Sequence, residues 1–224
     1  SEGDLWRRQR RMIQPSLHRK KLTGFTEMMK EVAKETAQAW EFKAASQEKV
    51  DVWIEMNRIT LETVSRALFG QTVPEQAQHI AHAVDVIQDD MSHRMYAVID
   101  TPLSIPTPRN RRLVSAIKEI EAVVYHFIER QRAGKAPASS MLDMLVTAAQ
   151  EEHSEMSDEQ LRDEVVTMFL AGNETTANLL SWTWHLLSRN PQVERRLADE
   201  FFEVLGDRDP DSKDLPRLPY TRCV

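Results

Sequence analysis

The sequence has 224 residues, of which 41% are hydrophobic and 29% charged, and its formal net charge is -6 at pH 7. This composition is that of a globular protein with a sizeable core, and the acidic balance argues against a nucleic-acid partner. The single cysteine, Cys223, excludes an internal disulfide. No apolar run approaches the length of about 20 residues that spans a membrane, and no secretory signal opens the chain. We expect a cytoplasmic protein, unless residues preceding Ser1 supply a membrane anchor.

Helical periodicity runs through nearly the whole sequence, and no stretch shows the alternation of a strand. N-cap residues such as Asp51, prolines such as Pro15 and Pro74, and glycines such as Gly70 mark the ends of the expected helices. We expect helices over about 4–14, 23–45, 51–69, 74–96, 109–133, 141–150, 158–189 and 191–205. The expected fold is all-α, with one domain over residues 1–224. The abrupt start and end of the helical pattern predict an internal piece of a larger protein.

The longest expected helix begins at a capping box, with Ser157 at the N-cap and Gln160 at N3. It continues to Asn190-Pro191, so its roughly 30 residues span about 45 Å at 1.5 Å per residue. Apolar residues lie on nearly every side, and a helix of this kind is expected to be buried. The stretch FLAGNETTAN, residues 169–178, departs from this pattern because it places glycine, a carboxylate and two threonines in an apolar run.

One face of this stretch carries residues spaced i, i+3, i+4 and i+7, namely Ala171, Glu174, Thr175 and Asn178. Because the helix is expected to be buried, we expect this polar face to line an internal cavity. Thr175 can turn its hydroxyl onto the carbonyl of Ala171, and Gly172 lets another group approach the backbone. A hydroxyl beside a carboxylate could relay protons to a small bound group. Tight helix packing explains the same Ala-Gly pair, and the motif alone favours packing.

A second polar pattern lies near the start of the chain, in LWRRQRRMIQPSL (residues 5–17). Trp6 and Arg10 are four residues apart and therefore share a face of the expected helix. An indole N–H and a guanidinium on one face suit the buried carboxylate of a ligand. Residues 1–21 hold seven Lys or Arg residues, which make a strong positive patch in an acidic chain. Taken alone, this segment is more simply a solvated basic helix anchored by its tryptophan.

Together the two patterns resemble the cytochrome P450 family, the haem-thiolate monooxygenases. Trp6–Arg10 matches the W-x-x-x-R motif of that family's C helix, and Ala171–Thr176 matches the A-G-x-[DE]-T-[TS] motif of its I helix. The likeness continues through Asn190-Pro191 and Glu200 to Leu218–Tyr220, which in the family leads into the K helix. The resemblance implies the central helical part of a cytochrome P450 fold, from the C helix through the J helix region. Such a piece is truncated at both ends and lacks most of the family's small β-sheets.

The resemblance also implies a role for each matching residue. Six of them would bind haem b or border its dioxygen pocket: Trp6, Arg10, Ala171, Gly172, Thr175 and Thr176. Trp6 and Arg10 would hydrogen-bond a haem propionate, while the Ala-Gly pair would border the place where dioxygen binds. Glu174 and Thr175 would be the catalytic acid–alcohol pair that steers protons while dioxygen is activated.

The implied activity is that of a monooxygenase that inserts one oxygen atom of dioxygen into an apolar small-molecule substrate. Electrons from NAD(P)H would arrive through a redox partner, a ferredoxin or a flavoprotein reductase, and the basic N-terminal patch could dock this partner. The family's E-x-x-R motif and cysteine-containing loop are missing, and Cys223 lacks the sequence context of the iron ligand. We therefore assign no metal ligand, and we expect the chain alone to be inactive.

A second class of protein stays open at this point. A non-enzymatic helical ligand-binding bundle, such as the sensor domain of a transcriptional regulator, also places long buried helices around an apolar cavity. Such a bundle has no evident reason to keep the W-x-x-x-R motif and the Glu-Thr pair at this separation. It would normally also bring a DNA-reading module, which the sequence lacks.

Overall fold

The computed structural model describes residues 3–14, 23–71, 77–97, 101–137, 140–150 and 157–224. Its regular elements are helices, and no strand occurs among the residues that it describes. This confirms the expected all-α fold class. Backbone contacts divide the chain into two compact units, Ser1–Ala67 with Ala171–Val224 and Leu68–Leu170. Each unit is described by itself below.

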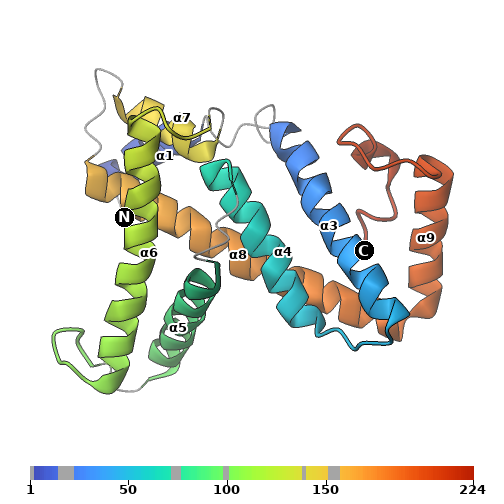
Figure 1. Ribbon diagram of the computed structural model, residues 1–224, viewed down its shortest axis with the longest axis horizontal. Coiled ribbons are helices and arrows are strands. Elements are labelled where there is room, and N and C mark those ends of the chain that lie inside the picture. The colour runs from blue at the N-terminus through green and yellow to red at the C-terminus, as the bar shows by residue number, and fades with distance from the viewer. Residues whose placement is uncertain (1–2, 15–22, 72–76, 98–100, 138–139, 151–156) are drawn as a thin grey trace. The chain divides into compact units, whose positions relative to one another are not determined.

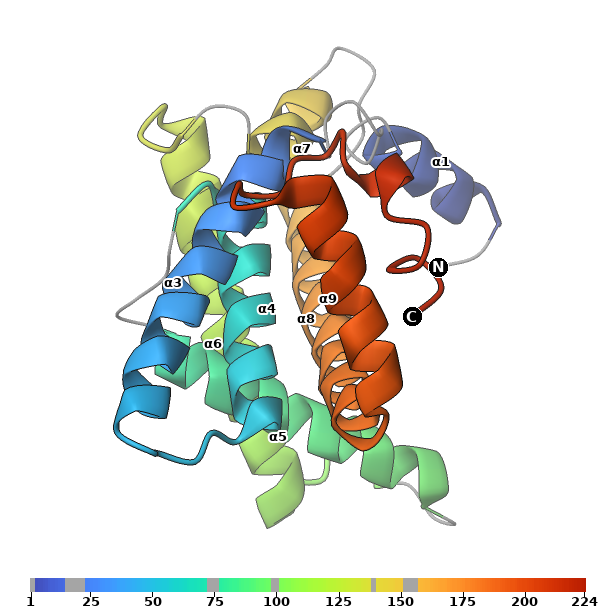
Figure 2. The same ribbon diagram turned by 90° about the vertical axis from the view of Figure 1, so that its right-hand side faces the viewer.

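The first unit is built from five α-helices or parts of them: α1 (Gly3–Ile13), α3 (Thr26–Ala45), most of α4 (Val52–Phe69), the C-terminal part of α8 (Asp158–Arg189) and α9 (Pro191–Leu205). Short 3-10 helices lie at Thr23–Phe25 and Leu215–Arg217. Helices α3 and α4 run side by side (Figures 1 and 2). They are linked by an ion pair between Lys43 Nζ and Glu55 Oε1 at 2.7 Å. The backbone N–H of Trp53 donates to the carboxylate of Asp51 at 3.0 Å, which confirms Asp51 as the cap of α4.

The second unit contains α5 (Ala77–Tyr96), α6 (Pro108–Arg132), α7 (Met141–Gln150) and the N-terminal part of α8. Helices α5 and α6 pack against each other (Figure 1). The buried residues of α6 recur every three or four positions: Leu113, Ala116, Ile120, Val124 and Phe127. This spacing places them on one face of the helix. Phe69 stacks on Phe127 with ring centres 4.2 Å apart, so aromatic contacts lie at the centre of this unit's core.

Several helix boundaries agree with the sequence signals. Ser157 and Gln160 form the expected capping box, with each side chain accepting the other residue's backbone N–H at 3.2 Å. Helix α8 then continues without a break to Arg189. Gly70 and Gly206, which directly follow α4 and α9, have positive φ angles of 72° and 57°. The prolines expected to end the first helix and to open the fourth lie outside the described residues.

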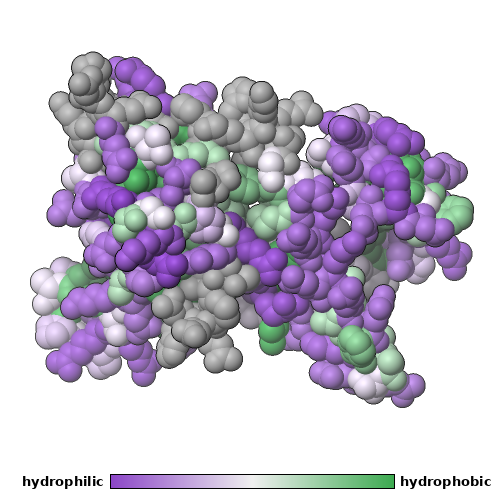
Figure 3. Space-filling view, turned by 45° about the horizontal axis from the view of Figure 1, so that its top comes forward, coloured by the Kyte–Doolittle hydropathy of each residue, from purple (hydrophilic) through white to green (hydrophobic). Residues whose placement is uncertain are grey.

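The expectation that α8 is buried on all sides is wrong for its C-terminal half. Leu179, Trp182 and Leu186 are 66%, 64% and 56% exposed, respectively. Asn173 and Ala177, on another side of the helix, are buried. An apolar sequence shows what a helix can bury, but the neighbouring elements decide which face is covered. On the face of the molecule shown in Figure 3, hydrophilic side chains predominate and hydrophobic ones form separate patches between them.

Candidate active site

The hydroxyl of Thr175 donates to the carbonyl oxygen of Ala171 at 2.7 Å, one turn earlier on α8. This confirms the hydrogen bond expected from the sequence. Thr183, two turns further on, makes the same kind of bond to the carbonyl of Leu179 at 2.8 Å. Back-bonding therefore does not distinguish Thr175 from another threonine of the helix. What distinguishes Thr175 is the carboxylate of the neighbouring residue, Glu174.

The side chains that flank this hydrogen bond share one exposed face of α8. Ala171, Glu174, Thr175 and Asn178 are all exposed, in agreement with the predicted spacing. The expectation that this face lines an internal cavity is wrong for the residues that the structure describes, because nothing among them covers it. Within the same residues, the carboxylate of Glu174 takes part in no hydrogen bond or ion pair, and its side chain is exposed.

Gly172 and Asn173, which lie between Ala171 and Glu174 in the motif, face α4 instead. A Cβ added to Gly172 would lie 3.0 Å from Val64 Cγ2, which is closer than side chains normally approach. Helix packing alone therefore accounts for glycine at this position. Thr60 Oγ1 lies 2.7 Å from Asn173 Oδ1, and both residues are buried. The pairing of Thr60 with Asn173 could not be predicted from the sequence, because the two residues lie 113 positions apart and no local pattern connects them.

Helix α1 brings Trp6 and Arg10 together on one face, as expected. The guanidinium carbon of Arg10 lies 5.4 Å from the centre of the Trp6 ring, a cation–π distance, and both side chains are exposed. The two side chains offer an indole N–H and a guanidinium, which are the donors that a carboxylate ligand such as a haem propionate requires. No hydrogen bond or ion pair of the described residues joins this pair to Glu174 or Thr175. Thr176 is exposed on α8.

The described residues provide no ready site for a metal ion. No three His, Cys, Asp or Glu side chains among them lie close enough together to hold one. Cys223 is exposed and lies in a turn, where its backbone N–H donates to the carbonyl of Tyr220 at 2.8 Å. Trp6 and Arg10 thus supply the donors that a haem propionate would require, and the described residues contain no group of three side chains that could hold a separate metal ion.

The segment before Cys223 is attached to α9 through Glu200. The carboxylate of Glu200 accepts the backbone N–H groups of Tyr220 and Thr221 at 2.7 and 2.8 Å, and the Thr221 hydroxyl at 2.6 Å. Partial burial opposes its ionisation, but these hydrogen bonds outweigh burial and hold the pKa of Glu200 below its ordinary value. Glu200 thereby caps the turn that begins at Leu218-Pro219-Tyr220.

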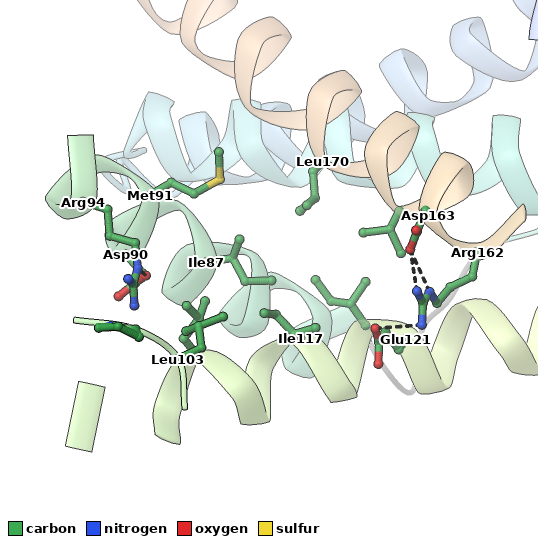
Figure 4. A pocket seen from close by; sticks show the side chains of 14 residues that line it. Ile87, Asp90, Met91, Arg94, Leu103, Ile117, Glu121, Arg162, Asp163 and Leu170 are labelled. Atoms are coloured by element: carbon green, nitrogen blue, oxygen red, sulfur yellow. Dashed lines mark hydrogen bonds and ion pairs between the residues drawn. The ribbon is translucent and has the colours of Figure 1, made fainter. Parts of the chain in front are cut away.

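The second unit contains a mainly apolar pocket of about 580 Å³ between α5, α6, the loop that joins them and the first half of α8 (Figure 4). Its apolar lining is Ile87, Met91, Pro102, Leu103, Leu113, Ile117, Ile120, Val166 and Leu170. The volume lies within the range of small-molecule sites, and the apolar lining suits an apolar ligand. No local sequence pattern predicted this pocket, because its walls come from segments far apart in the chain.

Ion pairs lie on both sides of this pocket. Asp90, which is 2% exposed, accepts hydrogen bonds from Arg94 and, at 2.6 Å, from Arg109. Burial opposes ionisation of Asp90, but the two guanidinium groups outweigh it and hold its pKa below the ordinary value. Elsewhere in the lining, Arg162 pairs with Asp163 at 2.6 Å and Glu121 at 3.1 Å (Figure 4).

Comparison with known proteins assigns the family. The model of the cytochrome P450 family matches residues 1–224, and the chain belongs to this family. It is 33% identical to the cyclooctatin synthase of Streptomyces melanosporofaciens, over 97% of this chain and 47% of that protein. It is 31% identical to the pentalenene oxygenase of Streptomyces avermitilis, over 96% of this chain and 47% of the relative. It is also 32% identical to cytochrome P450 72A15 of Arabidopsis thaliana, over all of this chain and 45% of that protein.

The chain thus spans about half the length of the curated relatives it matches. Family membership confirms the resemblance stated from the two motifs, and it removes the alternative of a regulator-type sensor bundle. None of the described helices combines the length and the apolarity needed to cross a bilayer.

Proposed function

We propose that the full-length protein is a haem-dependent monooxygenase that uses dioxygen and electrons from NAD(P)H to hydroxylate an apolar small molecule. One observation carries the proposal. The hydroxyl of Thr175, hydrogen-bonded to the carbonyl of Ala171 at 2.7 Å, shares an exposed face of α8 with the carboxylate of Glu174, which has no hydrogen-bond or ion-pair partner among the described residues. In a family of oxygen-activating enzymes, a hydroxyl and a carboxylate placed together on one helix are a means of delivering protons. The proposal requires this face to be covered in the full-length protein.

Haem supplies, when bound, the site at which dioxygen is bound and reduced. Trp6 and Arg10 would hold a propionate through the indole N–H and the guanidinium. On α8, the Thr175 hydroxyl rests on the Ala171 carbonyl and can turn to donate its proton. Glu174 can take up a proton from water and restore the one that Thr175 gives away, so the pair works as a relay.

The substrate class follows from the pocket of the second unit. Nine of its lining residues are apolar, and its volume of about 580 Å³ is suited to a small organic molecule. Two relatives bear names that denote a hydrocarbon and an alcohol, pentalenene oxygenase and cyclooctat-9-en-7-ol 5-monooxygenase. We therefore assign to this protein a substrate with a mainly hydrocarbon skeleton.

Electrons would come from a ferredoxin or a flavoprotein reductase with an acidic docking surface. Arg7, Arg10 and Arg11 are exposed on α1, in a chain whose net charge is -6. A local positive patch of this kind steers an acidic partner, and its effect weakens as salt screens the charges. The rate of electron transfer should therefore fall as the ionic strength is raised.

The decisive experiment compares two threonines of α8 in the full-length, haem-loaded protein. Hydrocarbon probes, pentalenene among them, are first screened by the shift in haem absorbance that binding produces. Product formed and hydrogen peroxide released are then measured per NADPH oxidised, with a bacterial ferredoxin and its reductase as electron donors. Thr175→Ala should divert reducing equivalents from product to peroxide. Thr183→Ala is the matched control, because it removes a back-bonded hydroxyl from the same helix.

The outcomes are distinct. A loss of product with a rise of peroxide in Thr175→Ala, absent from Thr183→Ala, supports the relay. If both variants keep the wild-type ratio of product to peroxide, Thr175 has no part in proton delivery. If the full-length protein binds no haem, the monooxygenase proposal itself fails.

A further inference from the structure

Two buried polar side chains join α4 to the motif-bearing turn of α8. Thr60 is 3% exposed and Asn173 is 4% exposed, and the hydroxyl oxygen of Thr60 lies 2.7 Å from Oδ1 of Asn173. Asn173 lies directly between Gly172 and Glu174, inside the motif that carries the proposed proton relay. A hydroxyl and a carboxamide are costly to bury unless they are hydrogen-bonded, so this pair needs its partner across the helix contact.

The hydrogen bond between the two helices is kept whichever way the hydroxyl proton of Thr60 points. Thr60 Oγ1 also lies 2.9 Å from the carbonyl oxygen of Met56, one turn earlier on α4, and 3.1 Å from that of Asn57 on the same helix. If the proton points to Asn173, Thr60 is the donor across the contact. If it points to Met56, the carboxamide of Asn173 can turn over and donate its NH₂ group to the same hydroxyl oxygen. Both arrangements keep a hydrogen bond between α4 and α8.

Neighbouring residues bring the two helices close together at this point. Val64, one turn after Thr60, lies against Gly172, where a Cβ would be only 3.0 Å from its methyl group. Ala177, one turn after Asn173, is fully buried. Apolar contacts between small residues tolerate some rotation of a helix, whereas a hydrogen bond weakens steeply when its angle changes. The polar pair therefore restricts the rotation of α8 more than the surrounding contacts do.

We infer that the hydrogen bond between Thr60 and Asn173 is a positioning element for the proposed active site. Successive residues of a helix are about 100° apart around its axis, so any rotation that separates Asn173 from Thr60 turns Glu174 and Thr175 through the same angle. The pair thus fixes the direction in which the carboxylate and the hydroxyl are presented. This inference rests on the proposed function for the role of Glu174 and Thr175, and on the geometry alone for the link between the helices.

The test replaces Thr60 in the full-length protein in two ways. Thr60→Val removes the hydroxyl and keeps the shape, while Thr60→Ser keeps the hydroxyl. Hydrogen exchange of the backbone amides of residues 171–178 is measured by mass spectrometry, together with peroxide released per NADPH oxidised. Thr60→Val should raise both quantities, the exchange rate by between about twofold and tenfold, as expected for the loss of one neutral hydrogen bond. Thr60→Ser should restore both toward the wild-type values.

Ser65→Ala is the matched control on the same helix. Ser65 is also buried, but its hydroxyl donates to the carbonyl of Leu61 at 2.7 Å, within α4. This variant should leave exchange at residues 171–178 unchanged. Equal exchange in Thr60→Val and wild type, or the same increase in Ser65→Ala, would overturn the inference. If the exchange result holds but Thr175→Ala leaves the ratio of product to peroxide unchanged, the helix link stands and the proton relay proposed for Glu174 and Thr175 fails.

Discussion

The buried carboxylate of Asp90 in α5 accepts a hydrogen bond at 2.6 Å from Nε of Arg109, which lies 19 residues later in α6. Arg94, one turn after Asp90, donates to the second carboxylate oxygen and, at 2.7 Å, to the side-chain oxygen of Asn110. Asn110 in turn donates to the carbonyl of Pro102 at 2.9 Å. These hydrogen bonds tie the loop between α5 and α6 to both helices, beside the apolar pocket.

Replacing Asp90 by Asn should lower the free energy of unfolding of the full-length protein by about 1–3 kcal/mol at pH 7, because two guanidinium groups lose a charged acceptor. Denaturant unfolding measures the change. Asp89→Asn is the control. The side chain of Asp89 also pairs with Arg109, at 3.3 Å, but it is 84% exposed. An exposed ion pair of this kind contributes less than about 1 kcal/mol to stability. An equal effect of the two substitutions would contradict the special role of Asp90.

The difference in stability between wild type and Asp90→Asn should depend on pH. The pKa of Asp90 is lower in the folded protein than its ordinary value of 3.8, so its stabilising effect is fully present above that value. As the pH falls below 3.8 toward the folded-state pKa, the carboxylate becomes protonated and the effect is lost. The difference in unfolding free energy between wild type and Asp90→Asn should therefore be constant between pH 5 and 7 and shrink below pH 4. A difference that grows on acidification would mean that burial dominates over the two guanidinium groups.

Haem retention tests the pair on α1. Arg10→Ala in the full-length protein should raise the rate of haem transfer to apomyoglobin by about tenfold, since one charged hydrogen bond to a propionate is lost. Trp6→Phe removes the indole N–H and keeps an aromatic ring beside Arg10, so it should have a smaller effect in the same direction. Arg11→Ala removes the same charge from the next position of the helix. If Arg11→Ala speeds haem loss as much as Arg10→Ala, the effect is one of general charge.

Changing Glu174 to Gln should slow NADPH-driven turnover while leaving the binding of a hydrocarbon probe nearly intact. The amide keeps the size of the side chain but cannot carry a proton from water, and loss of a proton-transfer group typically costs about a hundredfold or more in rate. Turnover and the absorbance shift on probe binding measure the two properties separately. Glu159→Gln, in the exposed first turn of α8, serves as the control. A loss confined to probe binding would contradict the proton-relay role.

A double-mutant cycle tests why residue 172 is glycine. Alanine is favoured over glycine within a helix by about 1 kcal/mol, but its Cβ would lie 3.0 Å from a methyl group of Val64, whose branched side chain has little freedom to move. Gly172→Ala should therefore destabilise the wild-type protein by about 1 kcal/mol or more. In a Val64→Ala background the same change should stabilise. Destabilisation of similar size in both backgrounds would show that another group occupies the space beside Gly172.

The local sequence was sufficient to predict where the helices lie. The capping box at Ser157, the cap at Asp51 and the glycine after α4 were recognised because each acts on backbone groups within a few residues. The two motifs also predicted the family, and the hydrogen bond from Thr175 to Ala171 followed from their spacing of one helical turn. These features depend on residues that are close together along the chain, so they can be predicted from the sequence alone.

Exposure and long-range pairing were decided by the tertiary structure. The apolar sequence of α8 predicted burial on all sides, yet Leu179 and Trp182 are exposed because a helix buries only the faces that other elements cover. No local sequence pattern indicates that Thr60 pairs with Asn173 or that Asp90 pairs with Arg109. Hydrogen bonds act over about 3 Å, and only packing brings such residues within that distance.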